Sequence, residues 1–216
     1  MDDEKLIELT AEEVRVLGAL IEKGKTTPDY YPMTLNGVRT ACNQKTSRNP
    51  IVDYDEGTII QILDSLRQKG LVGNVVGGGS RVTKYRHNLR VQYSLDEGEV
   101  AILCLLFLRG PLTAGEINSN AGRLYDFDNL EEVNEKLQTL QDAQPPFIQK
   151  LARKSGQKEM RYVHLYSPFD KEAYQAQTEI STPQNLVQEL QARVTTLEEQ
   201  LAQLREEFDA LMKELK

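Results

Sequence analysis

Several residue types are scarce in this chain of 216 residues, and each shortage removes a class of function. The sequence contains no tryptophan, only two cysteines and only two histidines. Two cysteines are too few for the disulfide framework that stabilises small secreted domains. We interpret Cys42 and Cys104, which both lie in helical patterns, as reduced core thiols of a cytoplasmic protein.

Long hydrophobic runs are missing as well. The longest apolar stretch, from Val100 to Leu108, has nine residues, whereas a membrane-spanning helix needs about 20. The sequence also shows no signal peptide. We therefore expect a cytoplasmic protein that has no membrane partner.

The chain has no excess of basic charge. Its 26 Lys and Arg residues face 33 Asp and Glu residues, for a net charge of −7. Residues 1–88 hold 12 basic and 12 acidic side chains, residues 89–168 hold 9 and 11, and residues 169–216 hold 5 and 10. Because nucleic-acid-binding proteins usually carry a basic patch, any such surface must be local and lie in residues 1–88.

The most informative pattern that is present is a repeat. Residues 95–110 align with residues 9–24 at an offset of 86, and the two copies differ mainly along one helical face, spaced i, i+3 and i+7. This face carries Arg15, Gly18 and Glu22 in the first copy and Ala101, Cys104 and Leu108 in the second. We interpret the first face as hydrated. The second, apolar face must be buried against a partner, which is either the first copy or another chain.

Residues 1–88 show three helical patterns followed by a hairpin pattern. The expected caps and stops of the helices are Thr10 with Glu13, Thr34, Asp55 and Gly70. Strands are expected at residues 71–76 and 81–87, joined by a glycine-rich tip at residues 77–80. This is the element order of a winged helix, which is a helix-turn-helix with an added β wing.

Residues 89–168 repeat that order. The expected elements are a helix over 95–109 capped by Ser94 and Glu97, a short helix capped by Thr113 and Glu116, a helix lined by Leu130, Val133, Leu137 and Leu140, and a hairpin of 147–152 with 160–166. The second strand of each hairpin carries a Tyr-x-His motif, at Tyr85 and His87 and at Tyr162 and His164. Because these two histidines lie in separate units, we expect packed or hydrogen-bonded rings and no bound metal.

The last part of the sequence predicts self-association. Residues 169–184 are polar and are interpreted as a linker, and residues 185–216 as a coiled-coil helix. Apolar residues recur there at spacings of three and four, at Val187, Leu190, Val194, Leu197, Leu201, Leu204, Phe208, Leu211 and Leu215. Such a seam is typical of a coiled coil and predicts a homodimer. The alternative is a helix that folds back onto its own chain.

Two motifs carry a family resemblance. The first starts at Leu17 and runs Leu-Gly-Ala-Leu-Ile-Glu-Lys-Gly-Lys-Thr-Thr-Pro-Asp-Tyr-Tyr-Pro, with Leu-Asn at position 35; the second starts at Ala41 and runs Ala-Cys-Asn-Gln-Lys-Thr-Ser-Arg-Asn-Pro. From about Leu9 to Pro168 the sequence resembles the YceH-like family of bacterial proteins. The resemblance implies a tandem pair of winged-helix domains, and it implies no activity because none is established for that family.

We therefore expect a mainly α chain with small β wings (an α+β fold). It consists of two tandem winged-helix domains, 1–88 and 89–168, followed by the C-terminal coiled-coil helix.

The first unit contains the candidates for contacts with double-stranded DNA. These are basic residues on the second helix, on the turn before the third helix and on the wing, namely Arg39, Lys45, Arg48, Arg81, Lys84 and Arg86. Against this hypothesis, the third helix starts with Asp53, Asp55 and Glu56, whose carboxylates would repel phosphates. The start of the corresponding second-unit helix, at residues 126–132, is more acidic still.

Two other functions are weighed against DNA association. A protein-interaction scaffold fits the acidic third helices, the net charge and the coiled coil. An enzyme has little support, because no nucleophile lies at a motif spacing from a base and the segment Gly77–Ser80 lacks the lysine and helix of a phosphate-binding loop. We expect a non-enzymatic protein that requires no cofactor.

Overall fold

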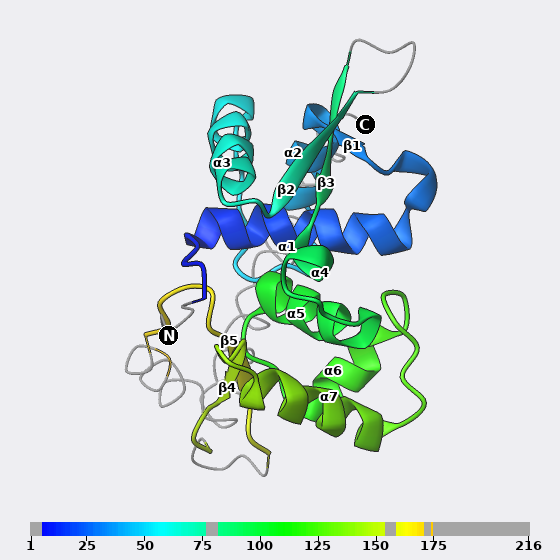
Figure 1. Cartoon of the computed structure of the whole chain (residues 1–216), viewed down its shortest axis with the longest axis vertical. Coiled ribbons are helices and arrows are strands. Elements are labelled where there is room, and N and C mark those ends of the chain that lie inside the picture. Colours follow the sequence, from blue (N-terminus) through cyan, green and yellow to red (C-terminus); the bar gives the residue numbers. More distant parts are fainter. Residues whose placement is uncertain (1–5, 77–81, 154–158, 171–173, 175–216) are drawn as a thin grey trace, which may run out of the picture. The chain divides into compact units, whose positions relative to one another are not determined.

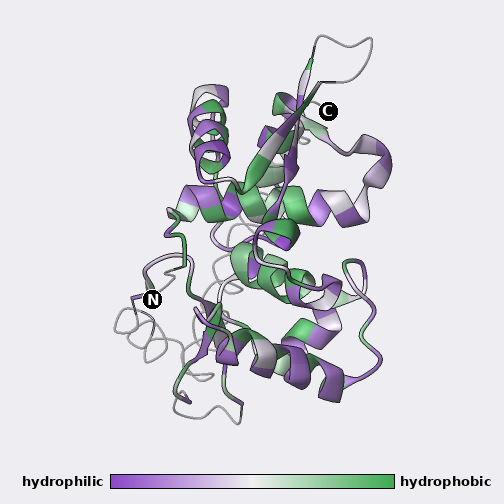
Figure 2. Cartoon of the chain, in the orientation of Figure 1, coloured by the Kyte–Doolittle hydropathy of each residue, from purple (hydrophilic) through white to green (hydrophobic). Residues whose placement is uncertain are grey.

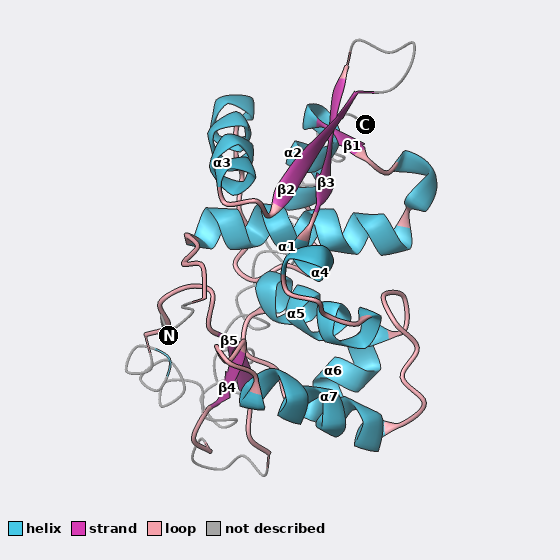
Figure 3. Ribbon diagram, viewed as in Figure 1, coloured by secondary structure: helices cyan, strands magenta, loops and turns pink. Residues whose placement is uncertain are grey.

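The computed structural model describes residues 6–76, 82–153, 159–170 and 174. The chain divides into two compact units, Met1–Phe169 and Asp170–Lys216. The predicted coiled-coil helix and most of the predicted linker lie outside the described residues. The fold is a mixed α+β arrangement of helices and small antiparallel sheets (Figure 3).

The first half of the Met1–Phe169 unit contains three α-helices and a three-stranded sheet. Its elements are α1 (Ala11–Thr26), η1 (Pro28–Tyr30), β1 (Met33–Thr34), α2 (Leu35–Cys42), α3 (Glu56–Gln68), β2 (Val72–Val76) and β3 (Thr83–His87). The strands are antiparallel in the order β1-β3-β2. The two-residue strand β1 was not predicted, because so short a segment has no recognisable periodicity.

The second half repeats this order after a short connecting helix. Its elements are α4 (Leu89–Gln92), α5 (Glu97–Arg109), α6 (Ala114–Ala121), α7 (Leu130–Asp142), β4 (Ile148–Lys150) and β5 (Tyr162–His164). Strands β4 and β5 pair antiparallel, and an isolated bridge joins Leu112 to Tyr162. The bridge occupies the place that β1 has in the first half.

Strand register shows that the two halves are built alike. In the first half Tyr85 pairs with Met33 on one side and with Asn74 on the other. In the second half Tyr162 pairs with Leu112 and with Lys150 in the same way. The Tyr-x-His motif therefore occupies the same position in both sheets.

Helix caps follow the sequence prediction with one correction. Thr10 and Glu13 form the predicted capping box of α1, and Asp55 caps α3. The predicted cap of α5 was wrong: Asp96 and Glu99 form the box, not Ser94 and Glu97. At the offset of 86, Asp96 and Glu99 are the counterparts of Thr10 and Glu13. The repeat thus places the start of α5 correctly, and the isolated cap motif places it two residues too early.

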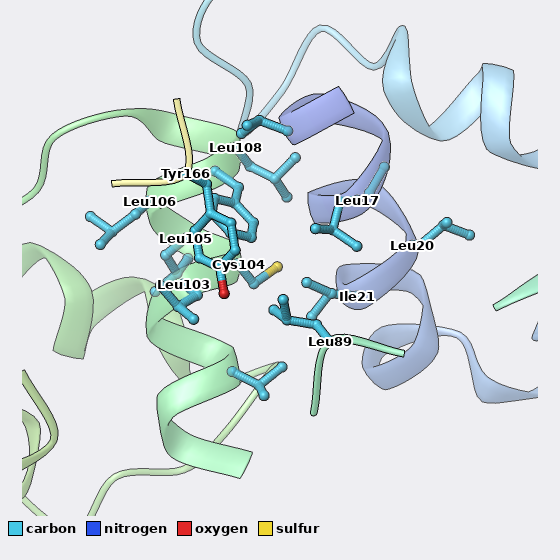
Figure 4. Packing of buried hydrophobic residues seen from close by; sticks show 14 of the residues in the cluster. Leu17, Leu20, Ile21, Leu89, Leu103, Cys104, Leu105, Leu106, Leu108 and Tyr166 are labelled. Atoms are coloured by element: carbon cyan, nitrogen blue, oxygen red, sulfur yellow. The ribbon is translucent and has the colours of Figure 1, made fainter. Parts of the chain in front are cut away.

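The apolar face of α5 packs against α1. Ala101, Cys104 and Leu108 are 3%, 0% and 2% exposed. Figure 4 shows Leu17 and Ile21 of α1 pointing toward Cys104. The prediction that this face meets a partner is confirmed, and the partner is the first copy of the repeat.

The corresponding face of α1 was predicted from the sequence to be hydrated, and this prediction was wrong. Gly18 lies where an added Cβ would come within 2.9 Å of the Leu108 side chain, and its carbonyl accepts a hydrogen bond from the Cys104 thiol at 3.5 Å. Arg15 is 3% exposed, and its guanidinium donates to the carbonyls of Cys42 and Pro50. Arg15 is therefore satisfied by backbone acceptors, and Glu22, which is half-buried, pairs with the side chain of Arg48. Composition does not reveal either partner.

The α1–α5 contact joins the two halves. Figure 1 shows α3 and the β2–β3 hairpin on one side of α1, with α5, α6 and α7 on the other. In Figure 2, α5 is mostly green, the hydrophobic colour, whereas α7 has large purple, hydrophilic areas. Within the described part of the chain, no helix combines the length and the apolar character needed to cross a membrane.

Candidate nucleic-acid interface

Helix α3 is the element that a helix-turn-helix would present to DNA. Its buried face, formed by Ile59, Ile62, Leu63 and Leu66, packs on the core of the first half. Its exposed face carries Glu56, Ile60, Gln61 and Arg67. Gln61 was not among the predicted site residues, although glutamine is a common reader of adenine. Its position on the helical face opposite the apolar residues could have predicted from the sequence that it is exposed.

The start of α3 is negatively charged. The Asp55 carboxylate accepts a hydrogen bond from the Thr58 amide at 2.7 Å, and this bond lowers the pKa of Asp55 below its ordinary value. Asp53 and Glu56, one on each side of Asp55 along the chain, are also exposed. Farther along the helix, Arg67 pairs with Asp64 at 3.1 Å. The start of the helix therefore exposes carboxylates, which repel phosphate. The charge of Arg67 is neutralised by Asp64, so α3 is a poor surface for binding phosphate.

The turn before α3 contributes one free cation and one buried one. Lys45 is exposed and forms no ion pair within the described part of the chain. The side chain of Arg48, in contrast, is 0% exposed. Its guanidinium donates to both carboxylate oxygens of Glu22, at 3.0 and 2.6 Å, and to the carbonyl of Ala41.

Arg48 is thus removed from the candidate DNA contacts. Burial would raise the pKa of Glu22, but the hydrogen bonds and charge of Arg48 hold it below its ordinary value. Glu22 is therefore charged near pH 7, and its partner Arg48 is buried. Breaking this pair to reach a phosphate would leave the half-buried Glu22 carboxylate with Lys23, 3.3 Å away, as its remaining ionic partner.

The β2–β3 hairpin, which is predicted from the sequence to be a wing, carries further predicted contact residues. Lys84 and Arg86 lie on β3 two residues apart and so on the same face of the strand. Lys84 is half-buried, Arg86 is exposed, and neither has a carboxylate partner among the described residues. Arg81 lies outside the described residues. Arg39 is half-buried on α2, where its guanidinium donates to Asn36 at 3.1 Å.

These cations do not form one continuous strip. Lys84 pairs across the sheet with Thr34, which caps the start of α2, whereas Lys45 follows the end of α2. An eight-residue helix is about 12 Å long, so the two lysines lie at opposite ends of it. Next to Lys45, Asn43 donates to the Asp53 carboxylate at 3.2 Å. The turn cation therefore sits close to the acidic start of α3, and the wing cations lie apart from it.

Helix α7 is the counterpart of α3 in the second half, and its exposed face is acidic. Helix α7 exposes Glu131, Glu135 and Asp142. The only cation in its sequence, Lys136, is bonded to Asp96, the cap of α5. The acidic character expected for this helix is thus present on its exposed face.

The two Tyr-x-His histidines are packed side chains. Burial lowers the pKa of both His87 and His164 to about 4, so both rings are neutral near pH 7. The His164 ring meets the Phe107 ring edge to face, with 5.0 Å between centroids. Across the described residues, no group of three or more His, Cys, Asp or Glu side chains is arranged to hold a metal ion.

Comparison with known proteins places the chain in a family. A family model described as "Protein of unknown function, DUF480" matches residues 9–157. A UPF0502 protein of Shewanella sp. strain MR-4 is 41% identical over 221 residues, covering 97% of this chain and 100% of the relative. A UPF0502 protein of Opitutus terrae is 48% identical over 164 residues, covering 76% and 71%. With a family model over most of its length and relatives that align nearly end to end, this chain belongs to the DUF480/UPF0502 family.

Proposed function

We propose that this chain is a non-enzymatic binding protein made of two winged-helix domains, and that it associates with double-stranded DNA through the first domain as a transcriptional regulator. The repeated order of three helices and a hairpin supports the winged-helix assignment. So does the strand order β1-β3-β2, in which the strand before α2 pairs with the last strand of the wing. The resemblance to the YceH-like family implies the same fold.

The observation that carries the DNA proposal is the pair of wing cations. Lys84 and Arg86 share one face of β3 and have no carboxylate partner among the described residues. Free cations at this spacing suit neighbouring phosphates of a DNA backbone. The acidic start of α3 opposes deep insertion into the groove, so the wing is expected to dock mainly on the backbone, with little sequence preference.

The test is DNA affinity across a salt series. Fluorescence anisotropy with a short labelled duplex should show binding that weakens steeply between about 50 and 200 mM salt. In the double variant Lys84→Gln/Arg86→Gln, affinity at low salt should fall at least tenfold. The salt slope should also decrease by about one for each lost phosphate contact.

A matched variant controls for the change in net charge. Lys150 and Arg153 are exposed cations of the second hairpin, and Lys150→Gln/Arg153→Gln removes the same two charges. This variant should keep the affinity and the slope of the unmodified protein. No binding at low salt, or an equal loss in both variants, would contradict docking through the first wing.

A protein-interaction scaffold is the second candidate, and the acidic faces of α3 and α7 favour it. Such surfaces suit a basic protein partner. A pull-down with the Asp55→Lys/Glu56→Lys variant tests this function, because a partner held by α3 should be lost on charge reversal. Glu131→Lys/Glu135→Lys is the matched reversal on α7. Recovery that neither variant alters would count against both helices as the contact.

Homodimerisation through residues 185–216 is part of the proposal, and it rests on the sequence seam from Val187 to Leu215. Sedimentation of the full chain should give twice the monomer mass. Leu197→Asp/Leu204→Asp, which places carboxylates in the seam, should give a monomer. A monomeric unmodified chain at micromolar concentration would rule out this dimer.

A further inference from the structure

A polar cavity of about 220 Å³ lies between the two halves of the Met1–Phe169 unit. The first half contributes the end of α1 and the loop before α3, and the second half contributes the ends of α5 and α6. The proposed DNA-binding function uses none of this space. Its charged side chains are Glu22, Lys23, Arg109 and Arg123.

Cations dominate this lining. The carboxylate Glu22 is already held by both nitrogens of the buried Arg48, so these two charges offset each other. Lys23 lies 3.3 Å from Glu22 and donates to Gln44. Arg109 has only neutral partners, and Arg123 is exposed with no hydrogen bond or ion pair among the described residues.

Helix ends offset part of this positive charge. Each helix C-terminus carries roughly half a negative charge, and α1, α5 and α6 all end at the cavity. Three cations therefore face roughly one and a half negative charges from the three helix ends. About one and a half positive charges remain in excess, and no carboxylate among the described residues pairs with Arg109 or Arg123.

The cavity wall is held in place before any ligand arrives. Ser47 has a left-handed backbone (φ 59°), which is uncommon for a residue other than glycine. Its hydroxyl accepts a hydrogen bond from Arg109 at 2.9 Å, and the neighbouring Asn49 amide donates to the carbonyl of Leu108 at 2.8 Å. These bonds fix the loop of the first half onto the end of α5. A preformed wall lowers the entropy cost of binding.

We propose that this cavity binds a small oxyanion, a phosphate- or carboxylate-bearing molecule that bridges the two halves. Arg123 and Arg109 would hold the anion from the second half, and Lys23 from the first. Planar guanidinium groups match the paired oxygens of both anion types. The hydroxyl of Ser47 and the amide of Asn120 are further donors on the wall.

The experiment is an NMR titration of the full chain with inorganic phosphate, and separately with malonate, at pH 7 and constant ionic strength. Saturable shifts are expected at the amides of Ser47, Asn120 and Arg123. Because Arg123 is exposed, Arg123→Gln should fold normally and weaken binding about tenfold, the effect of losing a charged hydrogen bond. Arg153→Gln, which removes an exposed arginine far from the lining residues in sequence, is the control and should bind as the unmodified protein does.

Binding of either ion that Arg123→Gln weakens supports the site, and the ion that binds identifies the ligand as phosphate- or carboxylate-bearing. The absence of saturable shifts with both ions would overturn the proposal. So would equal affinity in the unmodified protein and in Arg123→Gln, since the anion would then bind elsewhere. DNA affinity is not part of this readout, so the result is independent of the proposed function.

Discussion

At the scale of single residues, the close packing of the two halves depends on a glycine. Gly18 lies in the middle of α1, where glycine costs about 1 kcal/mol relative to alanine in an exposed helix. Here an added Cβ would stand 2.9 Å from Leu108 and 3.0 Å from Phe107. The missing side chain therefore permits the helix contact that holds the halves together.

The Gly18→Ala variant should be less stable than the unmodified protein by about 1–3 kcal/mol, the usual cost of overpacking. Urea unfolding measures this change. Gly57→Ala is the control, because Gly57 is exposed on α3 and an added Cβ would make only an ordinary 3.5 Å contact with its own cap. That variant should be neutral or slightly stabilised, and a stabilised Gly18→Ala would contradict the packing described here.

Burial of the two histidines makes stability dependent on pH. The pKa of each is lowered to about 4, against an ordinary value of 6.5. Between these values the unfolded chain binds protons that the folded chain does not, so stability falls as the pH drops below about 6.5. Each histidine contributes a loss of up to about 1.4 kcal/mol per pH unit.

Urea unfolding at pH 7, 6 and 5 tests this dependence above the range in which carboxylates titrate. His164→Leu, which puts an apolar group beside Phe107, should reduce the slope by about half. Stability that stays constant between pH 7 and 5 would show that the folded protein accepts the protons after all.

At the scale of elements, helices α1 and α5, which pack against each other, both start with a capping box. Thr10 with Glu13 and Asp96 with Glu99 form capping boxes at equivalent positions. Asp96 has a second role, because its carboxylate also binds Lys136 of α7. The cap of α5 therefore ties two helices of the second half together.

Asp96→Ala should lower the free energy of unfolding by about 1–2 kcal/mol through loss of the cap. The rival start of α5 is tested by Ser94→Gly. Ser94 has φ 53° and caps nothing in the structure, so glycine should be neutral or stabilising there. If thermal unfolding shows that Ser94→Gly loses more stability than Asp96→Ala, then Asp96 is not the N-cap of α5.

At the scale of the Met1–Phe169 unit, the two halves share one buried interface and should unfold together. Besides the α1–α5 contact, the Leu9 amide donates to the carbonyl of Tyr166 at 2.6 Å, joining the beginning of the first half to the end of the second. Aromatic rings of Tyr93, Phe107 and Phe147 surround Tyr166. Neither half can lose its structure without exposing the apolar face of the other.

Leu108→Glu tests this coupling, because it restores the residue type of the counterpart Glu22 at a site that is 2% exposed. An unpaired buried carboxylate should cost about 3 kcal/mol or more. Hydrogen exchange should then show that amides of β3 and β5 lose protection together. Leu130→Glu, at a position 46% exposed, is the control and should change stability by less than about 1 kcal/mol. Loss of protection in β5 alone would mean that the halves are independent.

Much of the secondary structure of this protein could be predicted from local sequence. The caps at Thr10, Thr34 and Asp55, the periodicity of the long helices and the 86-residue offset predicted the helix order and the burial of the α5 face. These features depend on neighbouring residues, or on a comparison of the sequence with itself, so they need no knowledge of long-range contacts.

Only the tertiary structure decided what the polar residues do. Arg48 was predicted to contact DNA, yet it bonds to Glu22, 26 residues away. Arg15 was expected in water and is buried against the backbone carbonyls of Cys42, at the end of α2, and Pro50, in the loop before α3. A charged side chain looks the same in sequence whether it meets solvent, phosphate or a buried carboxylate. Its partner is chosen by the fold, because chain segments far apart in sequence supply the groups that satisfy it.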